Sequence, residues 1–181
     1  AGVLSVSGGG SIALGTGNVT LGNIVNGGAN GVGNIGSSVN YFDTVFALAT
    51  SAQYADLAER YAADAVLEPG TVVELGGEKE ITTCQQDCSD RVLGVISTSA
   101  AYLMNAAAGD DATHPAVAVI GRVPTRVVGV VHKGDRLVSA GNGSARAAQP
   151  GEATWQTTIG RALDNKLDQG PGVIEATVSV K

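Results

Sequence analysis

The chain has 181 residues and a formal net charge of −6, with 17 acidic and 11 basic side chains. This length suits one moderate domain with an extension, and the acidic balance argues against a nucleic-acid-binding protein, which would present a basic face. No apolar run approaches the ~20 residues that a membrane-spanning helix needs, so we predict no membrane insertion.

Residues 1–42 carry no charged side chain and contain twelve glycines. Disordered arms usually owe their solubility to charge, and flexible glycine linkers usually lack branched apolar residues. Short runs of Val, Leu and Ile between Gly and Gly-Asn corners favour very short strands over the alternative of a flexible linker. A lone chain of this kind would leave its strand edges open. We therefore predict an oligomerisation arm that winds with two sister copies into a β shaft, as part of a homotrimer.

Apolar side chains of the arm would fill the threefold axis, and three aromatic residues would seal the end of the shaft. The predicted oligomerisation residues are Val3, Leu4, Val6, Ile12, Leu14, Val19, Leu21, Ile24, Ile35, Tyr41, Phe42 and Phe46.

A junction, residues 43–65, follows the arm, and five of the seven aromatic residues gather between Tyr41 and Tyr61. Their clustering predicts a collar that locks the arm to the rest of the chain. A capping-box spacing and helical apolar spacing predict a short helix over residues 51–64, with a strand after Tyr54 as the alternative. On a helix, the acidic side chains would form a solvated face; these are Asp56, Glu59 and Asp64.

The third region, residues 66–181, has an all-β pattern of β-branched runs between Gly and Pro turns. Pro124 cannot donate to a ladder and predicts an edge or a bulge. The predicted strands lie at residues 71–75, 81–83 and 92–96, within 116–131, and at 173–181. The fold class is therefore mainly all-β, with a small β-barrel-like domain and one short helix.

This region also resembles itself at a nearly constant offset. Gly70 and Gly94 are matched by Gly134 and Gly160, at offsets of 64 and 66 positions. The match predicts two similar β units in a pseudo-symmetric barrel, with chance similarity as the alternative.

The net charge differs between two parts of the chain. Residues 43–111 hold twelve acids and three bases, whereas residues 112–181 hold five acids and eight bases. Either this is chance, or the two halves pack on each other within or between subunits.

Few residues indicate chemistry. Cys84 and Cys88 supply at most half of a tetrahedral zinc site, so a local disulfide or two unpaired thiols are favoured. His114 and His132 lie in predicted surface turns, and no phosphate-binding loop is present. We predict no catalytic residue, no metal and no cofactor. Tyr102 and Trp155 could contact a receptor sugar, with a core position as the alternative for Trp155.

The segment Gly33–Ala47, GNIGSSVNYFDTVFA, resembles the junction between shaft and C-terminal domain in bacteriophage tail fibres. Ala49–Tyr61 and several later turns resemble those proteins too. The resemblance implies a structural virion protein, a homotrimer on the particle surface that takes part in host attachment. Its partners would be other tail, baseplate or capsid proteins and a host cell-surface glycan.

Two alternatives stay open beside the attachment fibre. Tyr54–Glu59 resembles the self-cleaving chaperone domains of some phage appendages, although no catalytic pair can be matched. A capsid decoration protein is the other alternative.

Overall fold

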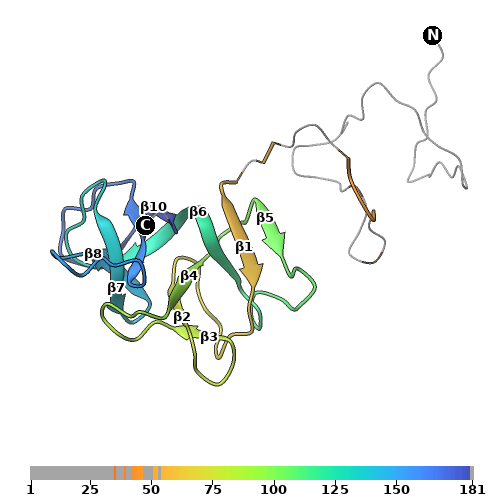
Figure 1. Ribbon diagram of the computed structural model, residues 1–181, viewed down its shortest axis with the longest axis horizontal. Coiled ribbons are helices and arrows are strands. Elements are labelled where there is room, and N and C mark those ends of the chain that lie inside the picture. The colour runs from red at the N-terminus through yellow and green to blue at the C-terminus, as the bar shows by residue number, and fades with distance from the viewer. Residues whose placement is uncertain (1–34, 36–38, 40–41, 47–50, 53, 180–181) are drawn as a thin grey trace, which may run out of the picture. The chain divides into compact units, whose positions relative to one another are not determined.

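The computed structural model describes residues 35, 39, 42–46, 51–52 and 54–179, and the fold is given for these residues. The chain divides into two units, residues 1–46 and residues 47–181. Ten strands form in the second unit, and the described residues contain no helix (Figure 1). The strands are β1 (Asp56–Arg60), β2 (Val72–Leu75), β3 (Ile81–Thr83), β4 (Val92–Ile96), β5 (Tyr102–Met104), β6 (Ala116–Val127), β7 (Arg136–Gly141), β8 (Ser144–Ala147), β9 (Thr158–Ala162) and β10 (Gly172–Val178).

The all-β prediction is confirmed, and β3 and β4 have the predicted bounds. Pro124 lies in β6 opposite Glu175 of β10, and among the described strands β10 is its one neighbour there. This agrees with the predicted edge, because a residue without an N–H can complete a ladder on one side only.

The short helix predicted over residues 51–64 is wrong, because the described part of this segment contains strand β1. Asp56 and Ala58 are both buried in it, which is the alternation of a strand. β1 pairs with β5 on one side and β6 on the other. Backbone pairing on both sides outweighs a weak local helix preference, and the alternative of a strand after Tyr54 is confirmed.

The strands form one ten-stranded sheet in the order β10-β9-β7-β8-β6-β4-β2-β3, with β1 and β5 branching from β6. Most pairs are antiparallel, whereas β1–β5 and β6–β8 are parallel. β10 also pairs with β6, so this path returns on itself, but Val127 and Ala145 are the single pair that joins β6 to β8. The predicted barrel is therefore not clearly formed.

The predicted internal repeat is present in the strand pairing. Val73 of β2 pairs with Gly94 of β4, and Leu137 of β7 pairs with Gly160 of β9. Both pairs lie beside a register shift. We name two repeats that meet inside β6: the first repeat is residues 56–119 and the second repeat is residues 120–178.

The correspondence also holds outside these pairs. A parallel bridge joins Ala63 to Ile81, and 64 positions later another joins Val127 to Ala145. β1 lies against the first half of β6 in the first repeat, while the second half of β6 lies against β10 in the second repeat. The first half of β6 therefore belongs to the first repeat and its second half to the second repeat. The second half of β6 holds the position in the second repeat that β1 holds in the first.

Two clusters of buried apolar side chains hold the sheet together. The larger cluster contains Val72 and Val95 of the first repeat together with Leu137 and Ile174 of the second. The smaller one, around Val73 and Ile81, lies within the first repeat. The larger cluster spans both repeats, so neither repeat closes its core alone.

Candidate functional site

A buried carboxylate marks the start of the first repeat. Asp56 is the first residue of β1 and is only 4% exposed, so its predicted place on a solvated helix face is wrong. Its Oδ2 accepts a hydrogen bond of 2.6 Å from Oγ of Ser97, a buried residue that follows β4. Asp56 and Ser97 therefore form a buried polar pair between the start of β1 and the end of β4.

The backbone around Asp56 is held on both sides. Its carbonyl oxygen accepts a hydrogen bond of 2.9 Å from the N–H of Ala101, and that of Ala55 accepts one of 3.1 Å from the N–H of Arg122. Gly121 has φ +113°, and a Cβ there would overlap Ala55 O and come within 2.8 Å of Asp56 Cα. Only glycine allows so close an approach, and this contact fixes the position of the acid.

A cavity of about 480 Å³ opens beside Asp56, within the volume range of ligand pockets. Its walls combine two carboxyl groups, one guanidinium, four hydroxyl-bearing side chains and several apolar groups. The lining residues are Tyr54, Ala55, Asp56, Ser97, Thr98, Ser99, Arg122, Val123, Pro124 and Glu175.

The second repeat lacks this polar pair. At the offsets established by the strand pairing, Ile120 corresponds to Asp56 and Leu163 corresponds to Ser97. Ile120 is 54% exposed whereas Asp56 is 4% exposed, so the two repeats differ at this position in burial as well as in polarity.

The other two acids considered with Asp56 serve neighbouring groups. Glu59 accepts a hydrogen bond of 2.9 Å from the phenol of Tyr61. Burial of that phenol, together with Glu59, raises the pKa of Tyr61 to about 12. Asp64 accepts hydrogen bonds from the backbone N–H groups of Glu78 and Lys79. Both acids therefore have structural partners, and neither lines the cavity.

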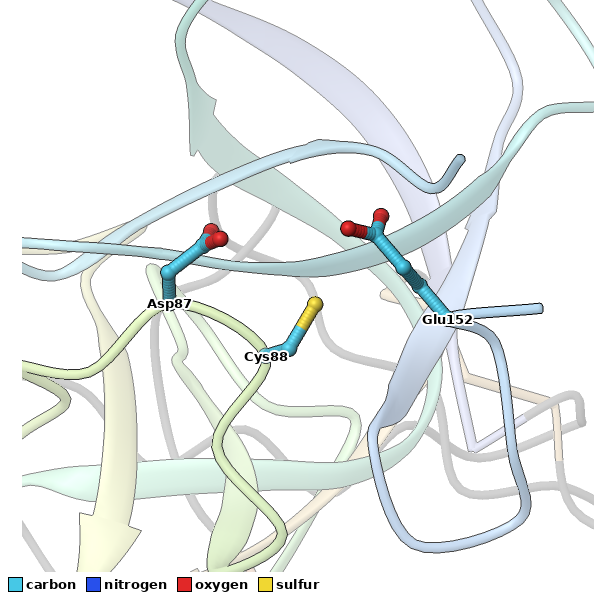
Figure 2. A group of neighbouring side chains, drawn as sticks. All are labelled: Asp87, Cys88 and Glu152. Carbon is cyan, nitrogen blue, oxygen red and sulfur yellow. The ribbon is translucent and has the colours of Figure 1, made fainter. Parts of the chain in front are cut away.

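A second polar cluster joins the two repeats. Figure 2 shows Asp87 and Cys88, from the loop between β3 and β4, facing Glu152, which precedes β9. Their ligand atoms lie within 4.8 Å of one another, a spacing that a metal ion could bridge. However, the guanidinium of Arg146 pairs with Asp87 at 2.7 Å and with Glu152 at 2.6 Å, and it lies 3.2 Å from the thiol.

Arg146 therefore supplies the positive charge that these acids need. It lowers the pKa of Asp87 and lowers the pKa of Glu152 to about 2. The two carboxylates in turn raise the pKa of Arg146. Because this cation is covalently part of the chain, the cluster is an ion-pair clamp between the repeats rather than a metal centre. The Asp87–Arg146 pair also joins the acidic half of the chain to the basic half.

Both cysteines are free thiols in the structure, which corresponds to the alternative of two unpaired thiols. Cys84 is buried and donates to Glu74 Oε2 at 3.4 Å, whereas Cys88 lies against Arg146. Burial is the main cause that raises the pKa of each thiol. Thiols that stay protonated are poor nucleophiles, so these environments disfavour catalysis by either cysteine.

The predicted oligomerisation residues lie largely outside the described residues. Ile35, Phe42 and Phe46 are described and exposed, Phe46 at 96%. The remaining ones, Val3, Leu4, Val6, Ile12, Leu14, Val19, Leu21, Ile24 and Tyr41, fall outside the described residues.

The two predicted receptor contacts are both at the surface. Tyr102 of β5 is 65% exposed and Trp155 is 72% exposed, so the alternative of a core position for Trp155 is wrong. They belong to different repeats, and neither lines the cavity beside Asp56. His114 lies in the loop before β6, with its ring Nδ1 3.1 Å from the hydroxyl of Thr113.

Comparison with known families gives one match, to Peptidase_G2, IMC autoproteolytic cleavage domain, over residues 11–111. The matched region is more than half of the 181 residues. The chain belongs to this family. The Peptidase_G2 match includes Asp56 and Ser97 and most of the first repeat, and it agrees with the self-cleaving class that Tyr54–Glu59 resembles. It also supports the resemblance to phage appendage proteins.

Two of the solved structures similar to this Peptidase_G2 chain come from bacteriophage phi29. The gene product 12 C-terminal fragment is 16% identical with a TM-score of 0.49, over 68% of this chain and 100% of that chain. The head fiber gp8.5 N base is 12% identical with a TM-score of 0.40, over 68% and 93%. Both scores lie below 0.5, too low to establish a shared fold. Comparison with curated proteins gives no match. Among the described residues, no helix is long and apolar enough to cross a bilayer.

Proposed function

We propose that this chain is the self-cleaving module of a bacteriophage virion appendage. The observation that carries the proposal is the autoproteolytic family match, which covers residues 11–111 and so includes the buried pair Asp56–Ser97. The phage origin is supported by the resemblance of Gly33–Ala47 to tail-fibre junctions.

The cavity supports hydrolysis of a peptide bond by water. The carboxylate of Asp56 removes a proton from the attacking water while the guanidinium of Arg122 stabilises the negative charge on the carbonyl oxygen. The C–N bond then breaks, and the proton held by Asp56 passes to the leaving amine. Ser97 keeps the carboxylate oriented through its 2.6 Å hydrogen bond and is a positioning residue.

Intact mass spectrometry of the full chain tests this mechanism. Asp56→Asn keeps the size of the side chain and its acceptor for Ser97, and it should slow self-cleavage by about 10²–10⁴-fold, as expected for loss of a general base. Ser97→Ala should slow it less. Asp90→Asn changes an exposed acid outside the cavity and should have no effect.

Circular dichroism must show that the Asp56→Asn chain is folded. If a folded Asp56→Asn chain cuts itself as fast as the wild type, the assignment of Asp56 is wrong. A wild-type chain that stays uncut would remove the self-cleaving function altogether.

We also propose that the arm forms the shaft of a homotrimeric appendage that takes part in host attachment. The charge-free, aliphatic sequence of residues 1–42 favours this second role, and the exposed rings of Phe42 and Phe46 are consistent with burial against sister copies. Tyr102 and Trp155 are exposed aromatic residues of the kind that contacts a cell-surface glycan. Binding of purified trimer to host-derived glycans, compared with a Tyr102→Ser/Trp155→Ser variant, tests the contact; equal binding contradicts it.

A further inference from the structure

The second repeat contains a polar cavity of its own, with a volume of about 460 Å³. Residues of β7 and β9 and of the loops before β7 and between β8 and β9 form its walls. Two glycines keep it open, because an added Cβ at either one would meet no heavy atom within 4 Å. The lining residues are Gly134, Asp135, Arg136, Ala148, Gln149, Pro150, Gly151, Ala153 and Arg161, and none of them lines the cavity beside Asp56.

Two arginines stand opposite each other in this wall. Arg136 of β7 and Arg161 of β9 are direct partners in the antiparallel ladder. Directly opposite side chains lie on the same face of a sheet, and like charges in such a pair are destabilising. In the first repeat the pair at the matching register is Val72 and Val95, both 0% exposed. The second repeat therefore places two cations at the surface where the first repeat buries an apolar pair.

Neither cation is neutralised within the described part of the chain, where neither arginine forms a salt bridge. Arg161 donates one hydrogen bond of 3.0 Å to the carbonyl oxygen of Gly134, which leaves its other N–H groups for a ligand. The side chain of Arg136 has no hydrogen-bond partner among the described residues. Asp135, the one acid in the wall, accepts a hydrogen bond of 2.8 Å from the backbone N–H of His132. The cavity therefore has a net positive charge and unused donors.

Building on the proposed role in host attachment, we propose that this cavity binds the carboxylate or phosphate group of an acidic cell-surface polysaccharide. The planar N–H forks of Arg136 and Arg161 match the oxygen pairs of these groups. A bound oxyanion would also remove the repulsion between the two guanidinium groups. The volume of about 460 Å³ lies within the range of ligand pockets.

The neighbouring loop favours a sugar as the carrier of the anionic group. Trp155 is 72% exposed and follows two residues after Ala153, which lines the cavity. An exposed ring of this kind can pack on the C–H face of a sugar while the arginines hold the acidic group. The net charge of −6 over the whole chain opposes a densely charged polyanion such as a nucleic acid. A polysaccharide with one acidic group per sugar unit fits both observations.

Binding of the full chain to polygalacturonate, poly(glycerol phosphate) and uncharged dextran at one ionic strength tests the proposal, with isothermal titration calorimetry as the measurement. We expect the wild type to bind an acidic polymer and not dextran, and its preference identifies carboxylate or phosphate as the anion. Arg136→Gln and Arg161→Gln should each weaken binding about tenfold or more, because charge-assisted hydrogen bonds are lost. Lys133→Gln is the matched control: it removes an exposed charge outside the cavity and should leave binding unchanged.

Thermal unfolding separates the site from the fold. Without ligand, Arg136→Gln should unfold at or above the wild-type temperature, because it removes a like-charge pair. Equal binding by the wild type and Arg136→Gln, or an equal loss in Lys133→Gln, would overturn the proposal. If Arg136→Gln still binds host-derived glycans as tightly as the wild type, the proposal fails and the role in attachment stands. A wild type that binds neither the acidic polymers nor host-derived glycans would overturn both.

Discussion

Gly121→Ala probes the contact that positions the candidate site. Gly121 lies in β6 with φ +113°, directly against the backbone of Ala55 and Asp56. Adding a methyl group forces either β6 or the start of β1 to move, and the carboxylate of Asp56 moves with it. Gly134→Ala is the matched control, because Gly134 also has a positive φ of +93° but has no heavy atom within 4 Å of an added Cβ.

The two substitutions should differ by the cost of the overlap. Gly134→Ala should lower the free energy of unfolding by about 1–2 kcal/mol, because it places a side chain in a left-handed backbone conformation. Gly121→Ala should lose a similar amount and a further amount of about 1–3 kcal/mol from overpacking against the neighbouring backbone. Its total loss of unfolding free energy is therefore about 2–5 kcal/mol. At about 4 °C per kcal/mol for a domain of this size, Tm should fall by about 4–8 °C for the control and about 8–20 °C for Gly121→Ala.

Thermal unfolding followed by circular dichroism at one protein concentration measures both losses, and intact mass measures self-cleavage. Fixing the concentration matters because association with sister copies would itself shift Tm. We expect Gly121→Ala to lose self-cleavage at temperatures where it remains folded, and Gly134→Ala to retain it. Equal stability losses with unchanged cleavage would refute the role given to the contact between Gly121 and Ala55.

Two further predictions concern the clamp and the arm. Wild-type stability should fall as the pH drops from about 4.5 towards 2, because Arg146 lowers the pKa of Glu152 to about 2 and also lowers that of Asp87. Stabilisation by such acids is present above their unfolded-state pKa and is lost as pH falls through the folded-state pKa. Arg146→Met should therefore flatten the decline of Tm between about pH 5 and pH 2, and parallel Tm curves would contradict the clamp. In the arm, Leu14→Asp with Leu21→Asp should convert a trimer of three 18.0 kDa chains to monomer in light scattering; a wild type that is already monomeric at micromolar concentration would exclude the shaft.

Most strands outside β1, β5 and β8 could be predicted from local sequence. Gly and Pro turns bound short β-branched runs, and such runs have few alternatives to a strand. The internal repeat could also be predicted, from the matching positions of its glycines. In the structure a Cβ at Gly94 would overlap the carbonyl oxygen of Ala118, and a Cβ at Gly160 would overlap that of Thr177. Glycine is the residue that such close approach requires, so the spacing of these glycines carries the repeat.

β1 and the candidate site could not be predicted in the same way. The sequence around Asp56 has helical spacing, and its strand conformation depends on β5 and β6, which lie 40 or more positions later in the chain. A helix over this segment would place Asp56 on its solvated face, so the sequence predicts an exposed side chain there. The resemblance of Tyr54–Glu59 to self-cleaving domains was the one signal that singled out this acid.

The sequence by itself determined the charge-free composition of residues 1–42, the β class of the rest and the offset of about 64 positions between its repeats. These properties depend on composition and on turn residues, which act over a few neighbouring positions. Only the tertiary structure decided that Asp56 meets Ser97, and that Arg146 rather than a metal ion neutralises Asp87 and Glu152. Contacts between distant residues follow from strand register, and register is set by the joint burial of apolar side chains across the whole sheet.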